Sequence, residues 1–280
     1  MISAVCVAGY VITNKYVYTH YDITPIEYSI VFALSGGFYA LLSFLYKIDR
    51  KRIRVFKQNL PSFIKLALAG TMAVSIFTIG LNYTSAVNAS ILSTLTIVTT
   101  ALFSHLFMRE RHSKAQLAWI GLLFAGLYLA IVGVNTVHLQ KGDAIVIAAM
   151  LFFGIGNAYS RVVMKRIGNA RLAPDARLMI GIVFALIASL FFLRQFRIIL
   201  DLLPFALLAG FFYWGCMKTF ARAVHSINAN NTVVLNNAHI FITSAASVWL
   251  LSEQYSIEKF VGSVIALLSI YHIAYKKRSN

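Results

Sequence analysis

Residues Leu81 to Lys114, LNYTSAVNASILSTLTIVTTALFSHLFMRERHSK, decide the fold of this chain. The segment opens with polar residues and closes on the charged cluster Arg109 to Arg111. No Asp, Glu, Lys or Arg lies between Tyr83 and Met108, a run of 26 residues. A helix rises about 1.5 Å per residue, so this run is long enough to cross the roughly 30 Å hydrocarbon core of a bilayer. The segment therefore predicts a membrane-spanning helix.

The composition of the whole chain agrees with this prediction. The chain has 280 residues, of which 59% are hydrophobic and 12% charged, and its mean hydropathy is +0.75. Soluble domains usually carry about twice that charged fraction. Apolar stretches of about 18 to 25 residues recur along the chain without the two-residue alternation of a transmembrane barrel. We therefore predict an all-α polytopic membrane protein.

Several functional classes are disfavoured by the sequence. The net charge of +16 is explained by Lys and Arg in loops on one side of a membrane, so we expect no nucleic-acid partner. Cys6 and Cys216 both lie in apolar segments, which indicates neither a disulfide framework nor a metal site. The chain contains no GxxxxGK[ST], HExxH or GxSxG motif. We therefore expect no enzymatic activity and no cofactor.

Ten membrane spans are predicted. They cover approximately residues 2–20, 24–46, 61–80, 83–108, 115–134, 143–164, 178–193, 202–221, 229–251 and 257–275. With both termini in the cytoplasm, the inner loops and the C-terminus hold 18 of the 25 Lys and Arg residues, and the outer loops hold four. This bias favours an integral protein of a bacterial inner membrane in that orientation. The first apolar segment has no small-residue cleavage site, so we interpret it as a span and not as a signal peptide.

The chain contains an internal repeat. Leu68-Ala69-Gly70 recurs as Leu208-Ala209-Gly210, and Asn88-Ala89 recurs as Asn228-Ala229, both at an offset of 140 residues. The order of these features is the same in both halves of the chain, which indicates a duplication.

The repeat divides the chain into two five-helix units, residues 1–138 and 139–280. Because five is odd, the two units must lie in the membrane with opposite orientations. Such inverted repeats are typical of secondary transporters, whose substrate site lies between the repeats near the midplane. The predicted fold is therefore ten transmembrane helices in two inverted five-helix repeats.

Small residues recur at the same place in each unit. Gly121-x-x-x-Ala125 and Gly262-x-x-x-Ala266 match at an offset of 141 residues. Small residues at i and i+4 let helices approach closely in lipid, so we expect the fifth and tenth spans to pack tightly, within the chain or between two copies. The protein is accordingly expected to be a monomer or a homodimer. The alternative is coincidence, because small pairs are common in membrane helices.

The ordered set Leu81 to Ala86, Asn88-Ala89, Glu110 and Gly121, followed by Gly142-Asp143 at the start of the second unit, resembles the EamA-type families of the drug/metabolite transporter superfamily. The resemblance covers nearly the whole chain. It implies ten helices, inverted repeats, a central cavity and export or exchange of small metabolites, amino acids among them.

Two family features are missing. An Arg common after the starting proline of the second span does not follow Pro25, and the proline common midway along the fourth span is replaced by Thr96 to Thr100.

Three of the cations within the predicted spans are candidate cavity residues. Polar groups in hydrocarbon are costly and indicate function. Lys15, beside Asn14, lies about five residues from the outer end of the first span. It is either a cavity cation that pairs with a substrate carboxylate or phosphate, or a lysine that extends to the interface. Arg161 and Lys218 carry the same two interpretations.

Spans four and nine are rich in amides and hydroxyls. Amides both donate and accept hydrogen bonds, which suits a zwitterionic or hydroxylated solute. The alternative is that these groups only hold helices together, and that the aromatic candidates only pack. The predicted substrate-binding residues are Asn14, Lys15, Tyr83, Asn88, Ser90, Thr94, Asn157, Arg161, Trp214, Lys218, Asn230 and Asn237.

Glu110 and Glu253 occupy equivalent positions in the two units. We predict that they are gating residues that pair with basic loop residues such as Arg109 or Arg111; the alternative is a solvated surface acid. All nine acidic residues lie at or near predicted span ends, so a proton relay through an acid at the membrane centre is not expected.

The sequence thus predicts a secondary transporter of small polar metabolites, with export of amino acids or related compounds as the leading version. Its expected partners are a small-molecule substrate and the lipid bilayer. Uptake or exchange of an anionic metabolite such as a nucleotide or sugar phosphate is the alternative, favoured if Lys15, Arg161 and Lys218 all face the cavity. A non-transporting membrane scaffold or a lipid-modifying enzyme is the alternative from another class.

Overall fold

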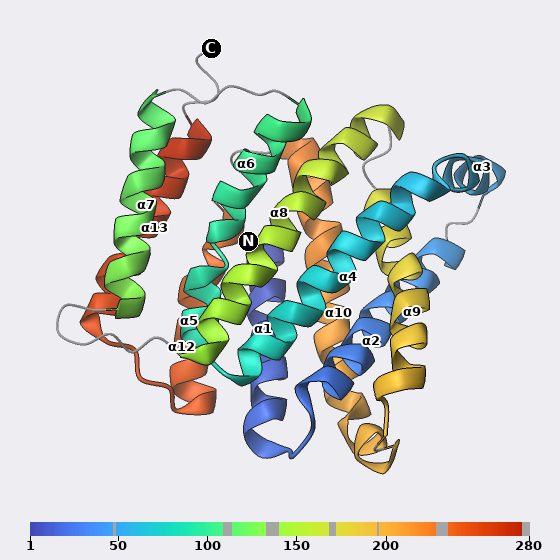
Figure 1. The fold of residues 1–280 in the computed structure, drawn as a ribbon, viewed down its shortest axis with the longest axis horizontal. Coiled ribbons are helices and arrows are strands. Elements are labelled where there is room, and N and C mark those ends of the chain that lie inside the picture. The colour runs from blue at the N-terminus through green and yellow to red at the C-terminus, as the bar shows by residue number, and fades with distance from the viewer. Residues whose placement is uncertain are drawn as a thin grey trace.

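All regular secondary structure in the described part of the chain is helical (Figure 1). The computed structural model describes residues 1–46, 49–108, 114–132, 140–167, 172–194, 196–227 and 235–275. The helices of the first unit are α1 (Ile2–His20), α2 (Pro25–Tyr46), α3 (Arg50–Gln58), α4 (Leu60–Asn82), α5 (Ala86–Leu92), α6 (Leu95–Met108) and α7 (Lys114–Val132). Those of the second are α8 (Lys141–Ile167), α9 (Leu172–Phe192), α10 (Phe196–Ile227), α12 (His239–Leu251) and α13 (Ile257–Tyr275).

Seven helical segments in these ranges are long and apolar enough to cross a membrane. They are α2, α4, the pair α5–α6, α7, α8, α9 and α10. The prediction of an all-helical membrane protein is confirmed at this level, whereas the count of ten spans stays a prediction.

The segment from Leu81 to Met108 is not one continuous helix, contrary to the prediction for residues 83–108. The helix breaks at Ser93 and Thr94, where backbone hydrogen bonds span three residues in place of four. The Ser93 hydroxyl donates to the Ser90 carbonyl (2.6 Å) and the Thr94 hydroxyl to the Ile91 carbonyl (2.8 Å). Hydroxyls that bond to the preceding turn bend helices, so the hydroxyl-rich sequence accounts for the break.

Two predicted loop regions contain helix. The basic stretch after α2 forms α3, whose N-terminus is capped by the Asp49 carboxylate accepting from the Arg52 amide (2.6 Å). The seventh span begins at Leu172 and not near residue 178, with Pro174 in its first turn, where a missing N–H costs nothing. Asp175 and Arg177 therefore lie in a helix, and assigning Arg177 to a loop was wrong.

The helices form a bundle with two distinct ends. Figure 1 shows α3 at the top, beside the last turns of α8 and the first turns of α4 and α9, and the start of α5 at the bottom. We call these the α3 end and the α5 end. The main packing pairs are α4 with α8, α7 with α13, α2 with α9, α1 with α10, α6 with α8, α2 with α10, α4 with α9, and α1 with α12.

The tight packing predicted for the fifth and tenth spans is present between α7 and α13. The residues that permit it are Gly126 and Gly262: a Cβ on Gly126 would lie 2.9 Å from the Gly262 carbonyl oxygen. Gly121, the residue singled out by the motif, has nothing within 4 Å of its Cβ position. The choice of Gly121 was wrong because the i, i+4 motif does not tell which side of a helix faces its neighbour.

Candidate functional site

An internal cavity of about 300 Å³ lies in the middle of the bundle and extends toward the α3 end. Its walls come from both units, and its apolar part includes Phe77, Met150 and Phe153. The volume is at the lower end of the roughly 300–1,000 Å³ found for small-molecule sites. Its polar lining residues are Ser93, Thr96, Thr100, Gln116, Asn157, Ser160, Arg161, Arg177, Asn236, Asn237 and His239.

The break between α5 and α6 gives the cavity part of its polar wall. Ser93, Thr96 and Thr100 line it, whereas Asn88, Ser90 and Thr94 are buried away from it. The predicted segment therefore contributes to the cavity wall, but through other residues than those predicted to bind the substrate.

His239 joins this wall to the second unit. Its Nε2 lies 3.0 Å from the Ser93 hydroxyl and its Nδ1 2.9 Å from the Asn236 carbonyl oxygen. The ring therefore holds α12 against the α5–α6 turn, with a hydrogen-bond partner at each nitrogen.

Three of the predicted substrate-binding residues line the cavity: Asn157, Arg161 and Asn237. Arg161 makes no ion pair with a described residue. Asn230 and the gating candidate Glu110 lie outside the described residues.

Lys15 does not line the cavity. Its Nζ donates to the carbonyl oxygens of Leu81 (3.2 Å) and Thr84 (2.7 Å) at the α5 end. Asn14 accepts from the Tyr28 hydroxyl (2.9 Å). Tyr83 is nearly half exposed at the same end. In this conformation Lys15 and Asn14 therefore connect helices through hydrogen bonds, a role that neither interpretation of Lys15 described.

Lys218 and Trp214 also lie outside the cavity lining. The Lys218 ammonium donates to Asp175 Oδ2 (2.5 Å), which Arg52 of α3 approaches at 3.5 Å. The Asp175 side chain is fully buried, so this charge cluster lies inside the protein next to the cavity wall. Trp214 stacks on Tyr39 with ring centroids 6.2 Å apart.

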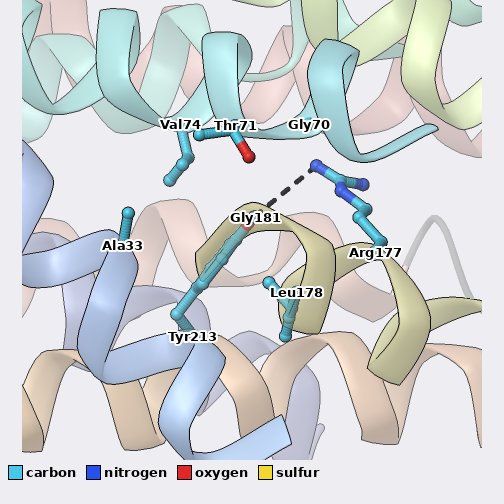
Figure 2. A pocket seen from close by; sticks show the side chains of 8 residues that line it. All are labelled: Ala33, Gly70, Thr71, Val74, Arg177, Leu178, Gly181 and Tyr213. Atoms are coloured by element: carbon cyan, nitrogen blue, oxygen red, sulfur yellow. Dashed lines mark hydrogen bonds between the residues drawn. The ribbon is translucent and has the colours of Figure 1, made fainter. Parts of the chain in front are cut away.

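Arg177 is a charged residue of the cavity wall that was not among the predicted binding residues. It lies on α9, is 6% exposed, and lines both the large cavity and a pocket of about 10 Å³ beside it. Figure 2 shows its guanidinium beside Gly70 of α4, joined to the Tyr213 hydroxyl (3.5 Å). A Cβ at Gly70 would collide with the guanidinium, so this repeat glycine makes room for the arginine.

One signal in the sequence pointed to Arg177. The family resemblance leads one to expect an arginine shortly after a proline at the start of the second span. That pair stands at the start of the seventh span, at Pro174 and Arg177.

The α5 end is closed by hydrogen bonds between the units. The Glu253 carboxylate accepts from the backbone amides of Ala86 (2.8 Å) and Val87 (3.1 Å), and so caps α5. Its hydrogen-bond partners among the described residues are these two backbone amides, whereas the basic residues named for it, Arg109 and Arg111, lie outside the described part of the chain.

Asp143 adds a second connection at this end. Its Oδ1 accepts from the Thr84 hydroxyl (2.5 Å) and its Oδ2 from the Gln140 amide (3.0 Å). The Ser85 amide in turn donates to the Gln140 side chain (3.1 Å). The start of the second unit is thereby attached to the α4–α5 connection.

An all-helical membrane protein with a central cavity between two repeated units, closed at one end, is the architecture of a transport protein. The family comparison agrees: the EamA-like transporter family matches residues 1–132 and again residues 140–275, so the chain belongs to that family. It is a membrane transport protein of the drug/metabolite transporter type.

Two individual proteins are similar to it. "Uncharacterized transporter YyaM" of Bacillus subtilis (strain 168) is 22% identical over 246 residues, which cover 82% of this chain and 77% of that protein. A solved structure described only as "Crystal structure of protein" superposes with a TM-score of 0.61 at 14% identity, covering 99% of this chain and 98% of the other. The second likeness is one of fold.

Proposed function

We propose that this protein is a secondary transporter that moves small polar organic solutes by alternating access and that it exports amino acids or related compounds. The observation that carries the proposal is the cavity of about 300 Å³ between the two units, with hydroxyl, amide and guanidinium groups in its wall. It extends toward the α3 end while the α5 end is held closed by Glu253 and Asp143. A site accessible from one side at a time is the requirement of alternating access.

The proposal includes ten spans in two inverted units, residues 1–138 and 139–280. The helix contacts support it. Exchanging α1 with α8, α2 with α9, α4 with α10, α6 with α12 and α7 with α13 turns the list of packing pairs into itself. For example, α4 with α8 becomes α10 with α1, and α6 with α8 becomes α12 with α1. A pseudo-two-fold axis between the units explains that correspondence.

We further propose that the α3 end faces the cytoplasm of a bacterium. Arg177 and Lys218 contact other side chains inside the bundle, and leaving them out lowers the inner total from 18 to 16 against four outside. The bias therefore persists. In this orientation the cavity extends toward the cytoplasm, the side from which a solute for export would enter.

The alternative of a nucleotide or sugar phosphate was tied to three cations in the cavity. Only Arg161 of the three lines it, while Lys15 and Lys218 are hydrogen-bonded elsewhere. A doubly charged phosphate ester is therefore not the substrate we propose.

Counterflow in proteoliposomes tests the function. Vesicles loaded with a pooled library of amino acids and related metabolites are diluted into the labelled pool, and exchange is read by mass spectrometry. We expect exchange of a small subset that depends on the protein. No exchange of any solute, with either gradient direction, overturns the proposal.

A matched pair of tryptophan variants connects that activity to the cavity. Asn157→Trp places a large side chain in the cavity, whereas Leu190→Trp adds the same side chain at a position that is 83% exposed. We expect N157W to lose exchange and L190W to keep it. Equal activity of the two variants would show that the cavity is not the transport path.

A further inference from the structure

We propose that Arg177 binds a carboxylate group of the transported solute; this inference rests on the proposed function and names its substrate class. The ligand class is a small organic acid or amino acid with a free carboxylate. Binding of the carboxylate can be measured without transport, so the inference about Arg177 and the proposed transport function can fail independently of each other.

Arg177 is a buried cation with incomplete hydrogen bonding. It is 6% exposed, and its Nε has no hydrogen-bond partner in the described part of the chain. Its one side-chain partner is the neutral Tyr213 hydroxyl, at the long distance of 3.5 Å. An isolated charge in a protein interior or in hydrocarbon is costly unless an anion neutralises it, and such residues mark substrate pathways.

The nearest carboxylate belongs to another cluster. Asp175 is two residues away on α9, and residues two apart do not face each other on a helix. Asp175 Oδ2 already accepts from Lys218 (2.5 Å) and lies 3.5 Å from Arg52. Among the described residues, no acid pairs with Arg177, and we infer that the carboxylate of the solute is its counter-ion.

The lining of the cavity suits an acid. It contains Arg177 and Arg161 and, over the described residues, no Asp or Glu. A guanidinium binds a carboxylate through two parallel N–H groups. Gly70 leaves the space in which the guanidinium lies along α4 (Figure 2). The amides of Asn157 and Asn237 in the same wall provide donors and acceptors for the rest of a polar solute.

The test measures binding first. Purified protein is mixed with single amino acids, hydroxy acids and short-chain carboxylic acids, each paired with its carboxamide, and thermal stabilisation and calorimetric binding are recorded. We expect the wild type to bind at least one acid about tenfold or more better than its carboxamide. Arg177→Gln should lower the affinity for the acid about 10- to 100-fold, the effect of losing a hydrogen-bonded charge partner. The affinity for the carboxamide should change by no more than about twofold.

Two further variants separate recognition from folding. Arg177→Lys keeps the charge without the paired donors and should recover part of the acid preference. Arg194→Gln makes the same exchange at an exposed residue beyond α9 and should behave as wild type. Each variant is compared by gel filtration and by its unfolding temperature without ligand.

The outcomes are distinct. Acid-selective binding that R177Q abolishes supports the inference, even where counterflow fails and the transport function falls. Exchange of solutes that lack a carboxylate, or an R177Q variant that weakens acid and carboxamide alike, overturns the inference and leaves the transport function standing.

Discussion

The two ends of the bundle use charged side chains in different ways. At the α5 end, Lys15 and Glu253 bind the backbone on either side of one turn: the lysine donates to the Thr84 carbonyl and the glutamate accepts from the Ala86 and Val87 amides. At the α3 end, Asp175 pairs with the side chains of Lys218 and Arg52, and Arg177 has no acidic partner among the described residues.

This difference indicates which end is fixed and which is adaptable in the conformation seen here. Helix termini expose unpaired amides and carbonyls, and a charged group that satisfies them holds the chain in one geometry. Long side chains that pair with each other reach new partners by changing rotamer. In the transport cycle that we propose, the α5 end is the closed seal, and the α3 end provides charges for a solute or for a second conformation.

The seal depends most on close backbone contact at Gly142. A Cβ there would meet the carbonyl oxygen of Gly80 and the backbone of Tyr83 and Thr84. We expect Gly142→Ala to destabilise the protein by more than about 2 kcal/mol, because backbone atoms cannot move aside. Gly121→Ala is the matched control, with nothing within 4 Å. Unfolding in detergent, followed by gel filtration, measures both; a G142A variant as stable as G121A would contradict the close contact.

Breaking the Asp175 cluster should have an effect of similar size. Asp175→Asn leaves Lys218 and Arg52 without their acid, and removing one partner of a buried ion pair typically costs about 3–5 kcal/mol; since the Lys218 side chain is 14% exposed, we expect the lower end. Adding Lys218→Met should restore part of the loss. Thermal unfolding of the single and double variants measures the coupling. If the double variant were less stable than D175N, the pair would not be the stabilising contact.

Weakening the cap on α5 should open the sealed end without unfolding the protein. Glu253→Gln replaces a charged acceptor by a neutral one, which costs about 1 kcal/mol and corresponds to roughly fivefold more opening. To measure this opening, Ser90, which is fully buried, is replaced by cysteine in a Cys6→Ser, Cys216→Ser background. In nanodiscs, opening of the α5 end then appears as faster labelling of that cysteine by a maleimide. Glu258→Gln, in the first turn of α13, is the control. Equal labelling rates in both variants would remove Glu253 from the seal.

Lys15 should show the smallest effect on solute recognition. Its ammonium group is bonded to two backbone carbonyls outside the cavity, so Lys15→Met should leave the KM of the exchanged solute within about twofold. It should lower stability by about 1 kcal/mol, the contribution of a typical hydrogen bond. A KM raised tenfold or more, with stability unchanged, would instead show that Lys15 takes part in substrate binding.

Several features of this protein were predictable from the sequence. Long apolar runs, scarce charges and the repeated Leu-Ala-Gly and Asn-Ala motifs predicted helical spans, two units and the EamA-type family. These conclusions depend on composition and order along the chain. Small errors in the predicted helix boundaries do not change these conclusions.

The site was predictable only in part. Of the residues predicted to bind substrate, Asn157, Arg161 and Asn237 line the cavity, while Asn88, Ser90 and Thr94 are buried away from it in a segment that contributes other residues to its wall. A soluble helix shows its buried face by a contrast between polar and apolar residues. In a membrane helix the lipid side is as apolar as the protein side, so the sequence carries little information on rotation about the helix axis.

The sequence by itself thus determined that this chain is a helical membrane transporter built from two similar units. Tertiary structure decided which charges are satisfied. Glu253 lies 167 residues from Ala86 and accepts a hydrogen bond from its amide, while Arg177 contacts Gly70 and Tyr213 from other helices and, in the described part of the chain, no acid. Which residues meet in this way depends on how helices that are distant in the sequence pack together. The surroundings of Arg177, and the solute carboxylate that we propose for it, therefore become visible only in the folded protein.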